Sequence, residues 1–196
     1  MCSSDLFTKP GVTSLALTDG MAEALLRNVM RNARLALQKP ADYDVRAEIM
    51  WAGTLSHNDI TGDRSQGDWA SHQLEHELGG MFDIAHGAGL AAIWGSWARY
   101  VLKQNPCRFA QLAVNVLNVP YSFGNDEKTA LEGIAAMEDF FRSIGMPTSI
   151  SDMEIELTDT QIKELAHKCS FMGRRTIGGF VTLNAADMEN IYRMAR

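Results

Sequence analysis

The sequence predicts an all-α protein built as a compact bundle of roughly seven or eight helices. Apolar residues recur at helical spacing along most of the chain, as at Met21, Leu25 and Val29. Residues that commonly begin or end helices separate these stretches. No stretch keeps the alternation of apolar and polar residues that marks a strand. These three observations together favour helices packed on helices.

The start of the chain differs from the rest. Residues 1–17 have no clear apolar period and include Pro10-Gly11, which favours an irregular segment. We therefore expect residues 18–196 to form one all-helical domain.

Caps and stop signals set the predicted helix ends. Pro40 ends the first helix, and Asp42 or Asp44 can cap the second. Thr158 and Gln161 have the spacing of a capping box. We expect helices near residues 19–39, 42–58, 68–79, 83–101, 106–117, 125–144, 158–169 and 184–194.

The composition of this 196-residue chain limits the classes of protein to which it can belong. A net charge of -6 without a cluster of Lys and Arg argues against nucleic acid as a partner. Cys2, Cys107 and Cys169 are few and far apart, as in a reduced cytosolic protein and unlike a disulfide framework. No stretch has the character of a signal peptide or a membrane span. We therefore expect a cytoplasmic protein that acts away from membranes.

Three of the five histidines lie within residues 68–90. His72 and His76 are four residues apart, so they project from one helix face with roughly 6 Å between them along the axis. Imidazoles in this arrangement suit Zn, Fe, Cu or Ni, and hydrogen-bonded core histidines are the alternative interpretation. The zinc-protease motif HExxH is excluded, because Gly80 stands where its second histidine is needed.

A helix break is predicted after this pair. Gly79 and Gly80 are poor helix-interior residues and common terminators. Asp83 can then cap a second helix that carries His86 near its first turn. The two helices would meet at a corner that brings His86 back toward His72.

The run from Asp68 to Leu90 closely resembles the signature of the iron-containing alcohol dehydrogenases, especially the butanol dehydrogenase branch. Further similar stretches follow the same order, at residues 40–52, 129–134 and 144–148. The similarity covers nearly the whole chain. It implies the C-terminal helical, metal-binding domain of such an enzyme, without its N-terminal nucleotide-binding domain.

The resemblance also implies the residues of a metal site. The family holds its metal with an Asp, a His three helical residues further on, and two later histidines. The later two match His72 and His86 in order and separation, and the first two fall at or before Met1. His76 matches the family histidine beside the metal, near the nicotinamide and the reacting alcohol. The resemblance therefore gives His72 and His86 as metal ligands and His76 as a catalytic residue that can relay a proton.

The function implied by the resemblance is oxidation and reduction of small alcohols and aldehydes. The chain would be the metal-binding part of an iron-dependent, NAD(P)-linked alcohol dehydrogenase or aldehyde reductase similar to butanol dehydrogenases. Fe²⁺, or Zn²⁺ as a substitute, would act as a Lewis acid on the alcohol oxygen, and NAD(P)H would serve the complete enzyme. Homodimers are common in the family.

A second function stays open. The family's first two metal ligands and its nucleotide-binding domain have no counterpart in the matched part of this sequence. The alternative is a catalytically inert, truncated helical protein that binds metal weakly or serves as an interaction module.

Overall fold

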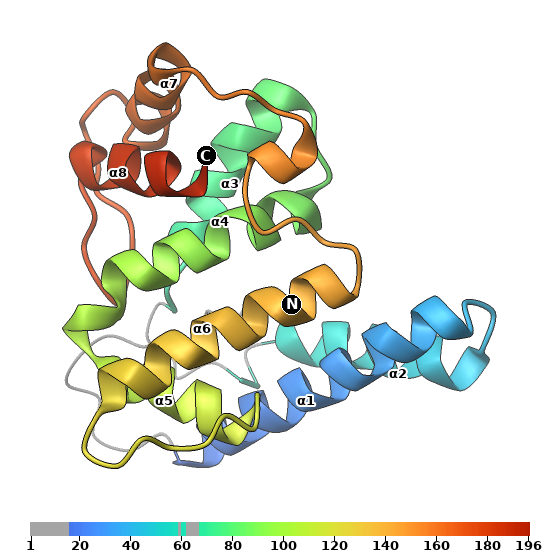
Figure 1. Ribbon diagram of the computed structural model, residues 1–196. Helices are drawn as coiled ribbons and strands as arrows, with labels where there is room; N and C mark the ends of the chain where they lie inside the picture. Colours follow the sequence, from blue (N-terminus) through green and yellow to red (C-terminus); the bar gives the residue numbers. More distant parts are fainter. Residues whose placement is uncertain (1–15, 59, 62–66) are drawn as a thin grey trace. The chain divides into compact units, whose positions relative to one another are not determined.

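A computed structural model describes residues 16–58, 60–61 and 67–196 of the chain (Figure 1). This part of the chain contains eight α-helices and two short 3-10 helices, and the pairing of Ile177 with Leu183 is its only β-bridge. The all-α prediction is therefore confirmed. Most of the segment predicted to be irregular, residues 1–17, lies outside the described residues, and α1 begins at Ala16.

The helices follow one another without a strand in the described ranges. The α-helices are α1 (Ala16–Gln38), α2 (Tyr43–Ser56), α3 (Ala70–Phe82), α4 (His86–Val101), α5 (Pro106–Asn115), α6 (Asp126–Ser143), α7 (Asp159–Cys169) and α8 (Ala185–Ala195). The 3-10 helices are η2 (Leu102–Gln104) and η3 (Ser151–Met153). Among the described residues, no helix combines the length and apolar character needed to cross a bilayer.

Side-chain caps explain several of these helix ends. The Asp42 carboxylate accepts hydrogen bonds from the backbone N–H groups of Asp44 and Val45 at the start of α2. Thr158 and Gln161 form the predicted capping box at the start of α7. Both predictions from local sequence are confirmed.

The predicted helix break at Gly79-Gly80 is wrong. Helix α3 continues to Phe82, and Asp83 ends it in the left-handed conformation, with φ of 51° and its N–H donating to the Gly79 carbonyl. Asp83 therefore does not cap the next helix, which Ala85 precedes without a side-chain cap. The two glycines lower helix propensity by only about 1 kcal/mol each, a cost that packing against neighbouring helices can offset.

Two compact units divide the chain. The first comprises residues 1–67 and 106–136, and the second comprises residues 68–105 and 137–196. Helix α6 contributes its first residues to one unit and its last residues to the other.

In the first unit, buried polar side chains link α1 to α5. Asp19 and Glu23 of α1 are 7% and 8% exposed. Arg108 donates to both carboxylate oxygens of Asp19, at 2.6 and 2.9 Å. Gln111 donates to both acids, and Asn115 donates to Glu23 at 2.8 Å. Asp19 is therefore paired with a cation, and Glu23 is held by hydrogen bonds from two neutral amides, so both buried carboxylates have partners.

We expect Asp19→Asn to lower the free energy of unfolding at about pH 7 by about 1–2 kcal/mol, because a charge-assisted pair is lost. Burial opposes the charge on Asp19, but hydrogen bonds from Arg108 and Gln111 outweigh it and lower its pKa. A lowered carboxyl pKa gives stability above the unfolded pKa of about 3.9 and loses it as pH falls through the folded pKa. Urea unfolding of wild type and Asp19→Asn is measured over this pH range. The difference between their free energies of unfolding should shrink below about pH 4.

A control for this experiment is Asp139→Asn, which removes an exposed ion pair with Arg142. Exposed pairs contribute little, so its effect should stay below about 1 kcal/mol at every pH. A difference between Asp19→Asn and wild type that does not change with pH would contradict the role given to Asp19.

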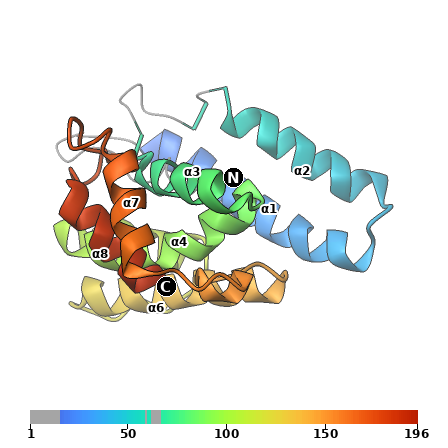
Figure 2. The same ribbon diagram turned by 90° about the horizontal axis from the view of Figure 1, so that it is seen from above.

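In the second unit, α3 packs against α4 and α7, and α8 packs against α4 and α7 (Figures 1 and 2). Leu74 and Leu78 of α3, Ile93 and Trp97 of α4, and Tyr192 of α8 are all at most 1% exposed. They recur at helical spacing on the inner faces of their helices, as the apolar pattern predicts. This core holds the apolar face of α3, and the opposite face of the helix lies outside the core.

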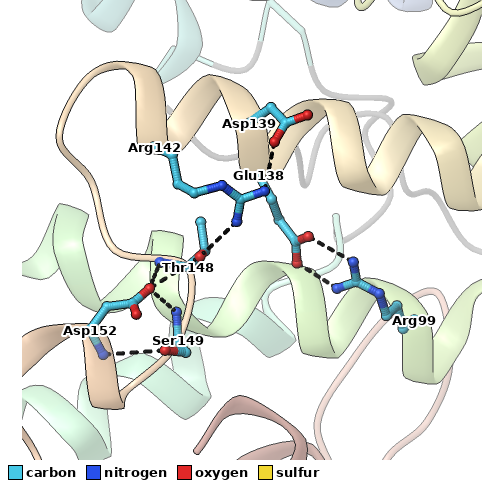
Figure 3. Close-up of polar contacts among 7 residues, drawn as sticks. All are labelled: Arg99, Glu138, Asp139, Arg142, Thr148, Ser149 and Asp152. Carbon is cyan, nitrogen blue, oxygen red and sulfur yellow. Dashed lines mark hydrogen bonds and ion pairs between the residues drawn. The ribbon is translucent and has the colours of Figure 1, made fainter.

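Ion pairs and a capped turn join α4, α6 and η3 within the same unit (Figure 3). Arg99 of α4 makes two hydrogen bonds to the Glu138 carboxylate of α6, one of them 2.7 Å long. After α6, the Asp152 carboxylate accepts from the backbone N–H groups of Thr148 and Ser149, at 2.8 and 3.0 Å. The hydrogen bond from Thr148 is the main cause of a lowered pKa for Asp152.

Candidate metal site

Three imidazole rings meet between the first half of α3 and the start of α4. His72 and His76 lie on one face of α3, with ring centroids 6.1 Å apart. His86 is the first residue of α4, and its ring centroid lies 5.2 Å from that of His72 and 5.4 Å from that of His76. The short segment between the helices therefore brings His86 back to the face that carries the other two rings.

A buried carboxylate accompanies these rings. The Glu75 side chain is 2% exposed, whereas the His86 side chain is 51% exposed. Nδ1 of His86 forms a hydrogen bond with Oε2 of Glu75. Glu75, His76 and His86 can each offer a ligand atom such that these atoms lie within 4.8 Å of one another. This group of possible ligand atoms thus contains one carboxylate and two imidazoles; His72 is not part of it, although its ring lies beside the other two.

Contacts from α7 and α8 hold α3 in place beneath the rings. The Tyr192 hydroxyl donates to the Leu74 carbonyl at 2.7 Å, and the Cys169 thiol donates to the Gln73 carbonyl at 3.3 Å. Burial raises the pKa of Tyr192 well above its ordinary value and that of Cys169 to about 11. Both groups therefore stay protonated and keep donating at neutral pH.

The loop before α8 also fixes the start of α3. Oδ1 of Asp68 accepts from the Ala70 N–H at 2.8 Å, and Oδ2 accepts from the N–H groups of Gly179 and Phe180 at 3.1 and 2.8 Å. Burial raises the pKa of Asp68, and these backbone donors oppose that change. Asp68 thus joins two segments distant in sequence, although it is not the N-cap of α3, since Trp69 occupies that position without a side-chain cap.

A pocket of about 370 Å³ opens beside the histidines. Its lining residues are Trp69, His72, Gln73, His76, Glu77, Phe171 and Arg175. The Arg175 guanidinium stacks 3.5 Å from the centre of the Phe171 ring, and its Nε donates to the Cys169 carbonyl at 2.8 Å. The pocket therefore has aromatic walls and a fixed cation close to His72 and His76.

The sequence prediction missed two parts of this cluster. Glu75 falls between Leu74 and Leu78 on the buried face of α3, and a carboxylate on an apolar helix face is a signal for a buried partner. Phe171 and Arg175 carry no such signal, because they reach the pocket from a turn about a hundred residues further along the chain.

The donor set fits a divalent transition metal. Imidazole nitrogens suit Fe²⁺ and Zn²⁺, and a carboxylate that accepts from a ligand histidine is a common companion of such sites. In the structure, the rings of all three predicted histidines lie together beside one face of α3. These residues are His72, His76 and His86. In contrast, His167 lies exposed on α7, away from the pocket lining.

The helical fold and the histidine cluster agree with a family of dehydrogenases. Residues 10–196 match the model of the Fe-containing alcohol dehydrogenase family, C-terminal part. The chain therefore belongs to the iron-containing alcohol dehydrogenase family, and its described helices are those of the family's C-terminal domain.

Individual relatives support this assignment. The chain is 36% identical over 182 residues to the probable NADH-dependent butanol dehydrogenase 1 of Bacillus subtilis, covering 93% of this chain and 46% of that protein. It is 31% identical over 189 residues to the NADPH-dependent aldehyde reductase YqhD of Escherichia coli, covering 96% and 47%. The chain thus spans about half the length of the relatives that it matches.

Solved structures give the same assignment for the fold. A substrate- and cofactor-free form of the aldehyde reductase YqhD from Escherichia coli superposes with a TM-score of 0.88 at 30% identity, over 99% of this chain and 50% of that one. An NADH-dependent butanol dehydrogenase A from Thermotoga maritima superposes with a TM-score of 0.87 at 28% identity, over 98% and 49%.

Proposed function

We propose that this chain is the metal-binding part of an iron-dependent, NAD(P)-linked alcohol dehydrogenase or aldehyde reductase. The observation that carries this proposal is the convergence of His72, His76 and His86, with ring centroids 5.2–6.1 Å apart, in a chain of this family. The named relatives reduce or oxidise small alcohols and aldehydes with NADH or NADPH, which supports the same reaction here.

His72 and His86 would hold the metal from two different helices. A bound Fe²⁺, or Zn²⁺ in its place, supplies a Lewis acid that polarises the substrate oxygen. His76 is exposed at the mouth of the pocket, so its imidazole can take a proton from the substrate hydroxyl or return one to it. Two imidazoles bind a divalent ion weakly, and further ligands would strengthen the site.

The pocket next to His72 and His76 would take the substrate. Trp69 and Phe171 offer apolar ring surface to a short alkyl chain and reduce the access of water to the reacting end. Arg175 stacks on Phe171 and so keeps that ring in position. The two aromatic rings and the histidines of this lining can receive the alkyl chain and the oxygen of a small aliphatic alcohol or aldehyde.

A chimera tests the proposal. The N-terminal half of the Bacillus subtilis relative, the part that this chain does not match, is joined to the chain, and NADH and NADPH oxidation is measured with butanal and Fe²⁺. The same half joined to its own C-terminal half is the positive control. Turnover by the chimera that His76→Ala reduces by about 10²-fold or more would support the proposal.

The alternative function predicts a different result. A chain that binds no metal, or a chimera without turnover while the positive control is active, would overturn the oxidoreductase proposal. With metal binding but no turnover, the chain would be a catalytically inert helical protein that binds metal weakly; without metal binding, it would be an interaction module.

A further inference from the structure

We propose that Glu75 is a positioning residue that fixes the ring of His86 for metal binding. The inference rests on the proposed function, since it takes His86 as a metal ligand. Glu75 belongs to α3 and His86 to α4, so their contact ties together the two helices that supply the imidazoles.

The hydrogen bond determines which nitrogen of His86 is available. A carboxylate can only accept, so Nδ1 of His86 must carry the hydrogen that Oε2 of Glu75 receives. Nε2 of the neutral ring then keeps its lone pair and can act as a ligand. Without Glu75, the ring could rotate, and either nitrogen could carry the hydrogen.

The surroundings of Glu75 hold its carboxylate in one place. A Cβ atom at Gly89 would lie 2.7 Å from Cγ of Glu75 and 2.8 Å from its Oε1, so only glycine allows α4 to approach this closely. The Glu75 side chain is 2% exposed, whereas His86 is 51% exposed. A buried, immobile acceptor beneath an exposed ring is the arrangement that orients a histidine ligand.

Nitrogen NMR of the whole chain labelled at histidine tests the tautomer directly. The His86 signals are assigned by their loss in His86→Ala, and the metal-free protein is studied at about pH 8, where most imidazoles are neutral. In wild type, we expect Nδ1 of His86 to carry the hydrogen. In Glu75→Met, which keeps the side-chain volume but removes the acceptor, we expect a mixture of tautomers.

Binding of Co²⁺ alone provides a second measurement. Loss of a carboxylate that orients a ligand typically weakens metal binding by about 10–100-fold, so Glu75→Met should fall in this range. Glu75→Gln keeps an oxygen acceptor of the same shape and should recover much of the lost affinity. Glu138→Met removes another carboxylate of the same unit and should change neither the tautomer nor Co²⁺ binding, although it leaves Arg99 without its partner.

The outcomes separate this inference from the proposed function. An Nε2-protonated His86 in wild type, or an unchanged tautomer in Glu75→Met, would overturn the positioning role. A wild-type chain with the expected tautomer that does not bind Co²⁺ would support the orientation of the His86 ring by Glu75 but contradict the proposed metal site and, with it, a role of Glu75 in metal binding. Unchanged Co²⁺ affinity in Glu75→Met would also count against the positioning role.

Discussion

Replacing His86 with alanine should lower the affinity of the chain for Co²⁺ by about 100-fold or more, since loss of a ligand exceeds the effect of losing its hydrogen-bond partner. His86 is the only one of the three clustered histidines that comes from α4. Without it, the remaining rings come from a single helix, with centroids 6.1 Å apart. Titration with Co²⁺, followed by its visible absorption, measures the change.

His167→Ala is the matched control for this prediction. His167 is exposed on α7 and does not line the pocket, so its removal should leave the affinity unchanged. Equal losses from His86→Ala and His167→Ala would show that the ligand assignment is wrong. Circular dichroism of both variants should show the helix content of wild type, which establishes that His86→Ala stays folded although it leaves the buried Glu75 carboxylate without its partner.

The second prediction with a large expected effect concerns the free energy of unfolding. Asp68→Ala should lower the free energy of unfolding by about 3 kcal/mol or more, because it leaves three backbone N–H groups without their acceptor. Those groups belong to Ala70, Gly179 and Phe180, and Asp68 itself is 2% exposed. Chemical unfolding of wild type and variant at neutral pH measures the difference.

Asp68→Asn separates the hydrogen bonds from the charge. Asparagine keeps one acceptor oxygen but turns a donor group toward the remaining N–H, so its loss of stability should be smaller than that of alanine. Both variants should also weaken Co²⁺ binding, since α3 carries His72 and His76 just after this anchor. Equal stability of Asp68→Ala and wild type would contradict the anchoring role.

Local signals explain what the sequence could predict of the fold. Thr158 with Gln161 and Asp42 before α2 act through bonds to residues at most three positions away, so their patterns are visible in the chain itself. The end of α3 could not be predicted in this way, and the end predicted at Gly79-Gly80 is wrong. Where α3 ends depends on packing and on the left-handed conformation of Asp83, and neither follows from propensity.

Of the candidate site, too, only the part that depends on local spacing could be predicted from the sequence. The helical period places His72 beside His76, and a short connection brings His86 near them, so this part follows from spacing. The role of Glu75 requires knowledge of which face of α3 is buried and how closely α4 approaches at Gly89. The position of Glu75 between Leu74 and Leu78 indicates a buried partner, but only tertiary packing identifies that partner as His86.

Anomalous X-ray diffraction from crystals of the chain soaked in Zn²⁺ tests the proposed metal site most directly. The account predicts one strong peak at about 2.0–2.1 Å from a nitrogen of His72 and a nitrogen of His86. A peak bonded to Glu75 and His76 without His72, or one at His57 or His167 alone, would contradict it.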